Sequence, residues 1–524
     1  MTWVAGAAMA GASTSESIIE SGPEPGPVNR RAVLAVAVVL VLVAVVGVVL
    51  WQSSRDTAAP GGSQAPAAAA RKPSELYAAD GTTLIARFDT DDPRDGCVRA
   101  PVNDWGFFCE YVVTWWQAQA LFGDDVAQRT DRLLHGGYRI GGSLDLQLQA
   151  GTKRRVDALL PVTDPKVFSL AAIEPGTGLV KTMAVNRNFR RQPLPTSSVD
   201  QNQPPLRLPA GPDTVAPIVS GDADTPGEAA GAPFMMFTLA AALDSGLRLD
   251  HAIDTKRVYQ SKYRIDPSSP AACNGGYWCP ANTGDPAYQS GRRTMWDAFG
   301  HSVLTYFVAL EEQVGANQAI AMAKRLGIAF RSKEDQTLSE PAANAQWGAF
   351  TLGVSATTAL DLANAYATLA ADGTHCDPLP VAKVADSGGR PVAGVGPNCA
   401  SVLRPEVARA AIDAGRCPLG DRSAFGDRCG AGKVLTTPVR AAVDRPVSGQ
   451  FGLTSNRRTF SLVIAAPQLA TAGMLTTAQG GTAQLGTGVP EAASGVIAGV
   501  AHDALAPLPA RDFTAPPREL ALAA

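Results

Sequence analysis

The sequence predicts an α+β fold, in which an antiparallel sheet is flanked by helices and joined to an all-helical subdomain. Two strand-like runs, residues 167–174 and 179–185, are connected by a Pro-Gly-Thr-Gly turn and form a predicted hairpin. Segments with apolar residues at helical spacing follow, and another strand-like run covers residues 458–465. This succession is typical of an antiparallel sheet with helices on its faces.

Residues 32–51 form an uninterrupted apolar run rich in Val, Leu and Ala, long enough to cross a hydrocarbon layer of about 30 Å as a helix. Arg30 and Arg31 precede the run and a single Arg55 follows it, which favours a cytoplasmic N-terminus. We therefore expect a cytoplasmic tail at residues 1–31, one transmembrane helix, and an extracytoplasmic remainder at the cytoplasmic membrane. Residues 52–73, rich in Ala, Pro, Gly and Ser, are a predicted flexible linker.

Residues 74–160 are a predicted small membrane-proximal linker domain. A strand-like stretch at 74–81 runs into a turn, and residues 110–122, 125–134 and 145–160 have helical spacing. Trp115, Trp116 and Phe122 are expected to form part of its core, and the alternative is an exposed docking face.

Residues 161–524 are the predicted main domain. Its expected helices cover residues 234–243, 303–314, 317–326 and 358–370. Between the hairpin and the first of these helices, residues 186–230 are rich in Pro, Asp and Gly and predict a long surface excursion.

All eight cysteines follow the apolar run and fall into four local couples, which predicts disulfides in an oxidising compartment. Other connectivities stay open on the sequence alone. The expected pairs are Cys97 with Cys109, Cys273 with Cys279, Cys376 with Cys399, and Cys417 with Cys429.

Composition and ligand spacing argue against two classes of partner. No Cys-x-x-Cys is present and the five histidines are scattered, so we expect no metal and no cofactor. The net charge is -3, with both signs interspersed and no long basic run, which argues against a nucleic-acid partner.

Several long motifs occur in one order along the chain. They are Gly136-Gly-Tyr-Arg-Ile-Gly-Gly-Ser-Leu-Asp-Leu-Gln-Leu-Gln149, Ala172-Ile-Glu-Pro-Gly-Thr-Gly178, and Leu352-Gly-Val with Asp361-Leu-Ala-Asn-Ala-Tyr-Ala-Thr-Leu-Ala-Ala-Asp-Gly373. In order and in residue sequence, these motifs resemble the transpeptidase part of class A penicillin-binding proteins of the actinobacterial type. The resemblance implies the penicillin-binding transpeptidase fold, which is shared with serine β-lactamases. Only about twenty residues separate Phe88 from Cys109, so the glycosyltransferase domain of full-length members is expected to be absent.

The first two catalytic motifs of this family are degenerate in the chain. The family acylates the Ser of Ser-x-x-Lys, with the Lys as proton acceptor and a Ser-x-Asn element beside it. The resemblance places Ala232 at the nucleophile and Met235 at the lysine. In the second motif Ser302 is kept, but Leu304 replaces the asparagine.

The third motif, Lys-Thr-Gly, lies on the strand along which the family docks its peptide, and the sequence predicts it at residues 433–435. Lys433 is kept there, whereas Val434 and Leu435 replace Thr and Gly. No lysine in the chain has a Ser three positions before it or a Gly two positions after it, so no substitute set is present. Ser302, Lys433, Thr436 and Thr437 are the remaining candidates for binding.

These substitutions remove hydroxyl, amine and amide groups together while keeping similar bulk. Replacing a whole buried polar network by apolar groups can be neutral, whereas removing one member leaves its partners unsatisfied. We therefore expect a catalytically inactive homologue that acts as a scaffold or regulator in peptidoglycan synthesis, with cell-wall synthesis or division proteins as partners. The alternatives are a binding protein for peptidoglycan stem peptides and an active acyl-serine enzyme that uses other residues.

Overall fold

The computed structural model describes residues 71–191, 211–283, 285–430, 438–477 and 483–523, and residues 72–524 form one compact unit. The predicted tail and transmembrane helix, residues 1–31 and 32–51, lie outside the described residues, as does nearly all of the predicted linker. Among the residues that are described, no helix combines the length and apolar character that a membrane span requires.

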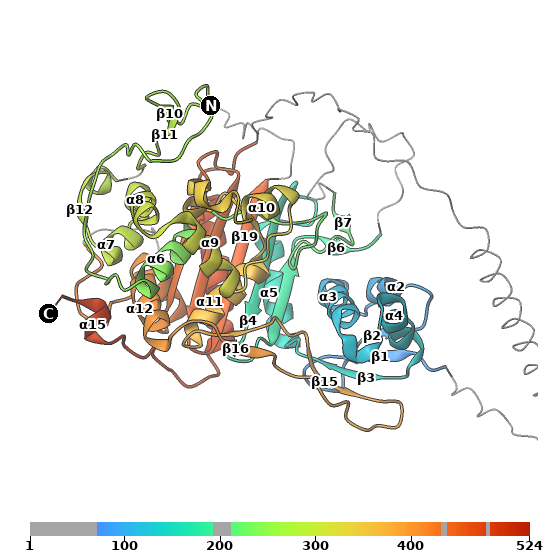
Figure 1. The fold of residues 1–524 in the computed structure, drawn as a ribbon. Coiled ribbons are helices and arrows are strands. Elements are labelled where there is room, and N and C mark those ends of the chain that lie inside the picture. The colour runs from blue at the N-terminus through green and yellow to red at the C-terminus, as the bar shows by residue number, and fades with distance from the viewer. Residues whose placement is uncertain (1–70, 192–210, 284, 431–437, 478–482, 524) are drawn as a thin grey trace, which may run out of the picture. The chain divides into compact units, whose positions relative to one another are not determined.

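A five-stranded antiparallel sheet forms the centre of the unit (Figure 1). Its order is β17 (Ser448–Leu453), β18 (Thr459–Ala466), β19 (Leu469–Thr477), β4 (Lys166–Ile173) and β5 (Val180–Val185). The predicted hairpin is the β4–β5 pair, and Gly176 and Gly178 take left-handed φ values of 77° and 76° in its turn. The strand expected at residues 458–465 is β18. Because β17 is an edge strand, one side of it is left for non-sheet neighbours.

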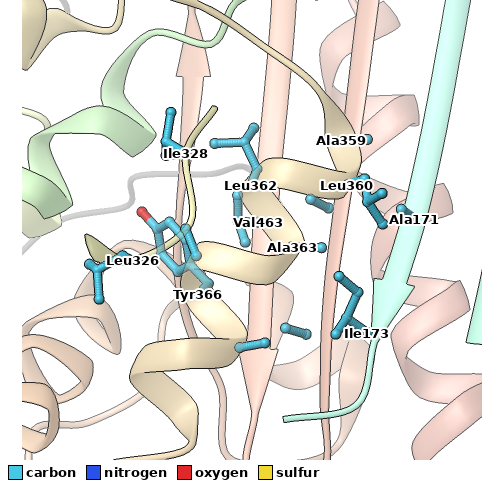
Figure 2. Close-up of a cluster of buried hydrophobic side chains, with 14 of the residues drawn as sticks. Ala171, Ile173, Leu326, Ile328, Ala359, Leu360, Leu362, Ala363, Tyr366 and Val463 are labelled. Atoms are coloured by element: carbon cyan, nitrogen blue, oxygen red, sulfur yellow. The ribbon is translucent and has the colours of Figure 1, made fainter. Parts of the chain in front are cut away.

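Helices cover both faces of this sheet, which confirms the predicted α+β content. On one face α11 (Ala359–Ala370) packs against β4, β18 and β19, and Figure 2 shows Leu360 and Ala363 close to Ala171, Ile173 and Val463 of these strands. On the other face lie α5 (Leu146–Leu159), α13 (Val439–Val443) and α14 (Val489–Leu505). Two apolar clusters, one on each face, form most of the core.

The remaining helices of the main domain include α6 and the three helices that pack against it, α8, α9 and α12. Their bounds are α6 (Met235–Asp244), α7 (Met295–Gly300), α8 (Leu304–Val314), α9 (Ala316–Arg325), α10 (Lys333–Leu338), α12 (Pro405–Gly415) and α15 (Arg518–Ala521), with 3-10 turns η2 (Ala232–Phe234), η3 (Pro286–Tyr288), η4 (Asn344–Gln346), η5 (Gly348–Leu352) and η6 (Cys417–Leu419). Every residue of α6 from Met235 to Leu243 is buried, so this helix is enclosed by α8, α9 and α12.

A second, four-stranded sheet has the order β15 (Val381–Ala385), β3 (Arg139–Gly142), β1 (Ser74–Tyr77) and β2 (Leu84–Phe88). Its helices are α2 (Pro93–Val98), α3 (Trp105–Ala118), η1 (Ala120–Phe122) and α4 (Val126–His135). β15 comes from beyond residue 160, so the late part of the chain completes the sheet of the predicted linker domain. Trp116 and Phe122 are fully buried and stacked with centroids 3.5 Å apart, as the core interpretation expects, while Trp115 is half-buried.

Short strand pairs connect these layers. They are β6 (Asn188–Phe189) with β7 (Asp213–Thr214), β8 (Glu228–Ala229) with β13 (Ala356–Thr357), β9 (Ile253–Thr255) with β12 (Gly291–Arg293), β10 (Ala272–Cys273) with β11 (Tyr277–Trp278), and β14 (Thr374–Cys376) with β16 (Cys399–Ser401). The predicted surface excursion is not wholly on the surface. Phe189, Ile218 and Val219 are buried, and Phe189 packs edge-on against Phe107 of α3 at 5.1 Å.

The four predicted disulfides are confirmed. Sulfur atoms of Cys97 and Cys109, Cys273 and Cys279, Cys376 and Cys399, and Cys417 and Cys429 are bonded. The Cys376–Cys399 bond closes the segment that carries β15, so this strand is covalently held close to β14 and β16.

Candidate functional site

Ala232 lies in a turn where three backbone segments meet at glycines. Gly231 has a left-handed φ of 75°, and its N–H donates to the Gly353 carbonyl at 3.2 Å. A Cβ at Gly353 would lie 2.1 Å from the Gly231 carbonyl oxygen, and a Cβ at Gly452 in β17 would lie 2.8 Å from the Ala232 nitrogen. Only glycine allows such close approaches, so Gly353 and Gly452 permit η5 and β17 to lie beside Ala232.

Hydrogen bonds from the core hold the same turn. Ser461 Oγ of β18 donates to the Ala230 carbonyl at 2.6 Å, and Tyr366 Oη of α11 donates to the Pro233 carbonyl at 2.9 Å. Ala232 is half-buried at the start of this turn, and Met235 is fully buried at the start of α6. A side chain at position 235 therefore sits in an apolar enclosure where an amine would pay a large desolvation penalty.

Ser302 and Leu304 belong to the connection between α7 and α8. Ser302 is a non-glycine residue with a left-handed φ of 51°, and its buried Oγ has no hydrogen-bond partner among the described residues. Leu304 is the first residue of α8 and packs half-buried against the same apolar cluster as Ala232 and Met235. The next residue, Thr305, is fixed by Asn282, whose Oδ1 accepts from its N–H at 2.9 Å.

β17 joins these two segments through Gln450. This side chain is fully buried, and its Nε2 donates to the Phe299 carbonyl at 2.9 Å, three residues before Ser302. One strand thus contacts the Ala232 turn through Gly452 and the α7–α8 connection through Gln450. In addition, α6, which begins at Met235, packs against α8, which begins at Leu304. We call Ala232, Met235, Ser302 and Leu304 together with β17 the Ala232 site.

The predicted third motif is not among the described residues. Lys433, Val434, Leu435, Thr436 and Thr437 all lie in residues 431–437. The strand that borders Ala232 instead carries Gly449-Gln-Phe-Gly-Leu-Thr454, which keeps both glycines and the last threonine of the family's Gly-Lys-Thr-Gly-Thr-Thr. The sequence analysis missed this candidate because the segment contains no lysine. The segment lies directly before the strand predicted at residues 458–465, and this position could have indicated it.

An imidazole and a carboxylate lie next to Ser302. His301 Nδ1 is 3.1 Å from Asp297 Oδ1, Arg293 is 3.0 Å from Asp297 Oδ2, and the His301 ring stacks on Tyr288 at 3.5 Å. Burial alone would raise the pKa of Asp297, but hydrogen bonds from His301 and Arg293 outweigh it and lower that pKa. The pair stabilises the end of α7.

The Ala232 site has apolar side chains at the three positions where the resemblance expects a nucleophile, a base and an amide. Ala232, Met235 and Leu304 carry neither a nucleophile nor a proton acceptor, and Gln450 contributes an amide in place of an amine. A cavity of about 260 Å³ lies at the β17–β18 turn and is lined in part by Ala229 and Thr454, and another of about 180 Å³ lies beside Asp372 and Phe513. Within the described part of the chain, no group of His, Cys, Asp and Glu side chains could hold a metal ion.

Comparison with known proteins finds a family model that matches part of the chain. Residues 233–409 match the family model described as the penicillin binding protein transpeptidase domain. Penicillin-binding protein 1A of Aquifex aeolicus is 29% identical over 201 residues, which are 38% of this chain and 24% of that protein. The match thus spans about a quarter of the relative's length.

Solved structures share the fold at low identity. Penicillin-Binding Protein 1A from Haemophilus influenzae superposes with a TM-score of 0.57 at 13% identity, covering 86% of this chain and 94% of that one. Penicillin binding protein 3 from Mycobacterium tuberculosis gives 0.55 at 16% identity, covering 87% and 99%. At such identities the likeness concerns the fold alone.

Proposed function

We propose that this chain, whose residues 233–409 match the penicillin binding protein transpeptidase domain, is a non-catalytic homologue that acts as a scaffold or regulator in peptidoglycan synthesis. The observation that carries this proposal is Ala232. It occupies the glycine-bounded turn at the start of α6, where the resemblance expects the nucleophilic serine. Loss of nucleophile and base together typically costs on the order of 10⁶ in rate.

The neighbours of Ala232 support the same conclusion. Met235 is fully buried at the position of the lysine, and Leu304 packs on the same cluster at the position of the asparagine. If β17 supplies the third element, as we propose, Gln450 replaces its lysine and is already bonded to the Phe299 carbonyl. The position of Lys433 relative to this site stays a prediction.

Covalent labelling with a fluorescent penicillin tests the proposal. The full-length protein is incubated with the label, and adducts are read on a denaturing gel and mapped by mass spectrometry. We expect no adduct on the wild type and none on Ala232→Ser alone, because the hydroxyl still lacks a base. A labelled serine in the wild type would refute the proposal.

A combined variant serves as the positive control for labelling. Ala232→Ser with Met235→Lys, Leu304→Asn and Gln450→Lys restores each family group at the position proposed here, and measurable labelling is expected if the variant melts like the wild type. The scaffold role is tested separately by crosslinking the wild type in its membranes and identifying partners. Recovery of cell-wall synthesis or division proteins is the expected result.

A further inference from the structure

Glu311 of α8 is a carboxylic acid enclosed in the protein. Its side chain is fully buried, and neither of its carboxyl oxygens has a hydrogen-bond partner among the described residues. Val308, one helical turn earlier, is also fully buried, so both residues lie on the same side of α8. A buried carboxylate without partners is strongly disfavoured, so the closed structure holds this side chain in its neutral form.

The 3-10 turn η5 closes the enclosure around Glu311. It packs on α8, and at its Gly348 an added Cβ would lie only 2.0 Å from Cδ2 of the Tyr263 ring. Tyr263 is buried in one apolar cluster with Val308. The Tyr263 hydroxyl and the Thr351 main chain of η5 both border the Glu311 carboxyl group. Water can therefore reach this group only if η5 or Tyr263 moves.

The groups near Glu311 give an ionised carboxylate little support. Lys262 is exposed, and its Nζ donates to the Glu312 main-chain carbonyl at 2.9 Å. The Glu312 carboxylate, which accepts from Tyr259 Oη at 2.9 Å, adds a like charge. Tyr263 is a neutral neighbour, because burial raises its pKa. Burial likewise raises the pKa of Glu311 well above its ordinary value.

The other elements that pack on α8 supply no counter-charge to Glu311. The turn η5 contains no charged residue. The charged residues of α6, α7, α9 and β9, and the histidine before β9, are engaged with other partners. They are Asp244 with Arg325, Asp297 with Arg293, Lys324 with the Ser339 carbonyl, Asp254 with Arg292, and His251 with Gln313. Ionisation of Glu311 therefore requires that the enclosure open to water.

The same turn η5 also holds the segment that carries Ala232. Gly353 directly follows η5 with a left-handed φ of 69°, and its carbonyl accepts from the Gly231 N–H at 3.2 Å. The hydroxyls of Thr351 and Thr238 of α6 are joined by a 2.7 Å hydrogen bond. Movement of η5 away from α8 would therefore break its contacts with Gly231 and with α6, and would release the Ala232 turn.

We propose that Glu311 is a pH-dependent switch: as a neutral acid it keeps η5 closed on α8, and its ionisation opens η5 and frees the Ala232 turn. One proton passes from the Glu311 carboxyl group to solvent in each opening. Because the closed form binds this proton more tightly than the open form does, rising pH favours opening. The switch rests on packing and burial, not on chemistry at Ala232, so its test and penicillin labelling give separate results.

Hydrogen exchange of the full-length protein between pH 5.5 and pH 8.5 tests the proposal. The reporting amides are Gly353, whose N–H donates to the Phe350 carbonyl, and Gly231, whose N–H donates to the Gly353 carbonyl. Their protection factors, corrected for the intrinsic exchange rate at each pH, should fall by up to about tenfold per pH unit, because one proton is released. Both amides should stay less protected than β19, which reports global unfolding.

Two variants remove the titratable group. Glu311→Gln keeps the shape of the side chain but cannot ionise, so protection at Gly353 and Gly231 should no longer depend on pH. Glu311→Met should give the same result and buries no polar atom, which guards against poor folding of the glutamine variant. The matched control Glu491→Gln removes an exposed carboxylate from α14 and should keep the wild-type pH dependence.

Three outcomes would overturn the proposal. Protection at Gly353 and Gly231 equal to that of β19 at every pH would show that these amides exchange only through global unfolding. Loss of protection at Gly353 while Gly231 stays protected would show that η5 opens without releasing the Ala232 turn. A pH dependence that persists in both Glu311 variants would assign the proton to another group. The first two outcomes are read on the wild type and do not depend on how well the variants fold.

Discussion

The amide of Gln450 donates a 2.9 Å hydrogen bond to the main-chain carbonyl of Phe299, and both groups are enclosed in the protein. This contact links the edge strand β17 to the end of α7, 151 residues away in sequence. Among the described residues, no other hydrogen bond joins β17 to the segment from Phe299 to Ser302.

Gln450→Met should destabilise the protein by about 1–3 kcal/mol, because the buried Phe299 carbonyl loses the Gln450 amide as a donor and the Phe451 N–H loses its side-chain acceptor. Urea unfolding of the purified protein measures the change. Gln336→Met is the matched control, since Gln336 also donates to a main-chain carbonyl but is exposed on α10. That exchange should alter the free energy of unfolding by no more than about 0.5 kcal/mol. Equal effects at the two positions would contradict the expectation.

Gly452→Ala should disrupt the Ala232 turn. The new Cβ would lie 2.2 Å from the Ala230 carbonyl oxygen, so β17 must move away, at a cost of at least about 1–3 kcal/mol. Gly495→Ala in α14 is the control, because nothing lies within 4 Å of its added Cβ and alanine favours helix by up to about 1 kcal/mol. Melting temperatures should move in opposite directions.

Glu110 should make stability depend on pH. Burial raises its pKa to about 7, even though Arg94 Nε lies 2.9 Å from its carboxylate. Because this folded pKa exceeds the ordinary value, the unfolded chain releases the proton first as pH rises above about 4.5. The folded state retains the proton up to about pH 7, so stability should fall between these two values, by about 3 kcal/mol in all.

Glu110→Gln should remove that part of the pH dependence, as measured by urea unfolding at pH 5 and pH 7.5. Glu519→Gln, an exposed exchange on α15, should keep the wild-type slope. An unchanged slope in the Glu110 variant would show that another group titrates in this range.

The Cys376–Cys399 disulfide should stabilise the pairing of β15 with β3 in the four-stranded sheet. Replacing both cysteines by Ala removes a closure of 23 residues in sequence and should cost about 3 kcal/mol. Hydrogen exchange at residues 381–385 should rise before exchange in β19. The Cys273–Cys279 disulfide has a sequence separation of only 6, so replacing both of its cysteines by Ala should lower the free energy of unfolding by less. The reverse order of losses would contradict the loop-length argument.

Much of the local structure followed from the sequence because it depends on neighbours in the chain. The Pro-Gly-Thr-Gly turn predicted the β4–β5 hairpin, and helical apolar spacing predicted α6, α8, α9 and α11. Cysteine spacing predicted all four disulfides, since short loops favour local pairing. The resemblance to penicillin-binding transpeptidases is confirmed by the family match at residues 233–409. It rested on motifs whose residues can still be recognised in the sequence.

Tertiary structure alone decided which strand borders Ala232. The structure shows β17 beside Ala232, in an approach that depends on the absence of a Cβ at Gly452, and the position predicted for Lys433 lies outside the described residues. It likewise decided that β15 completes the small sheet. Such contacts join residues far apart in the chain, and their energies depend on close packing in space, which local patterns do not record.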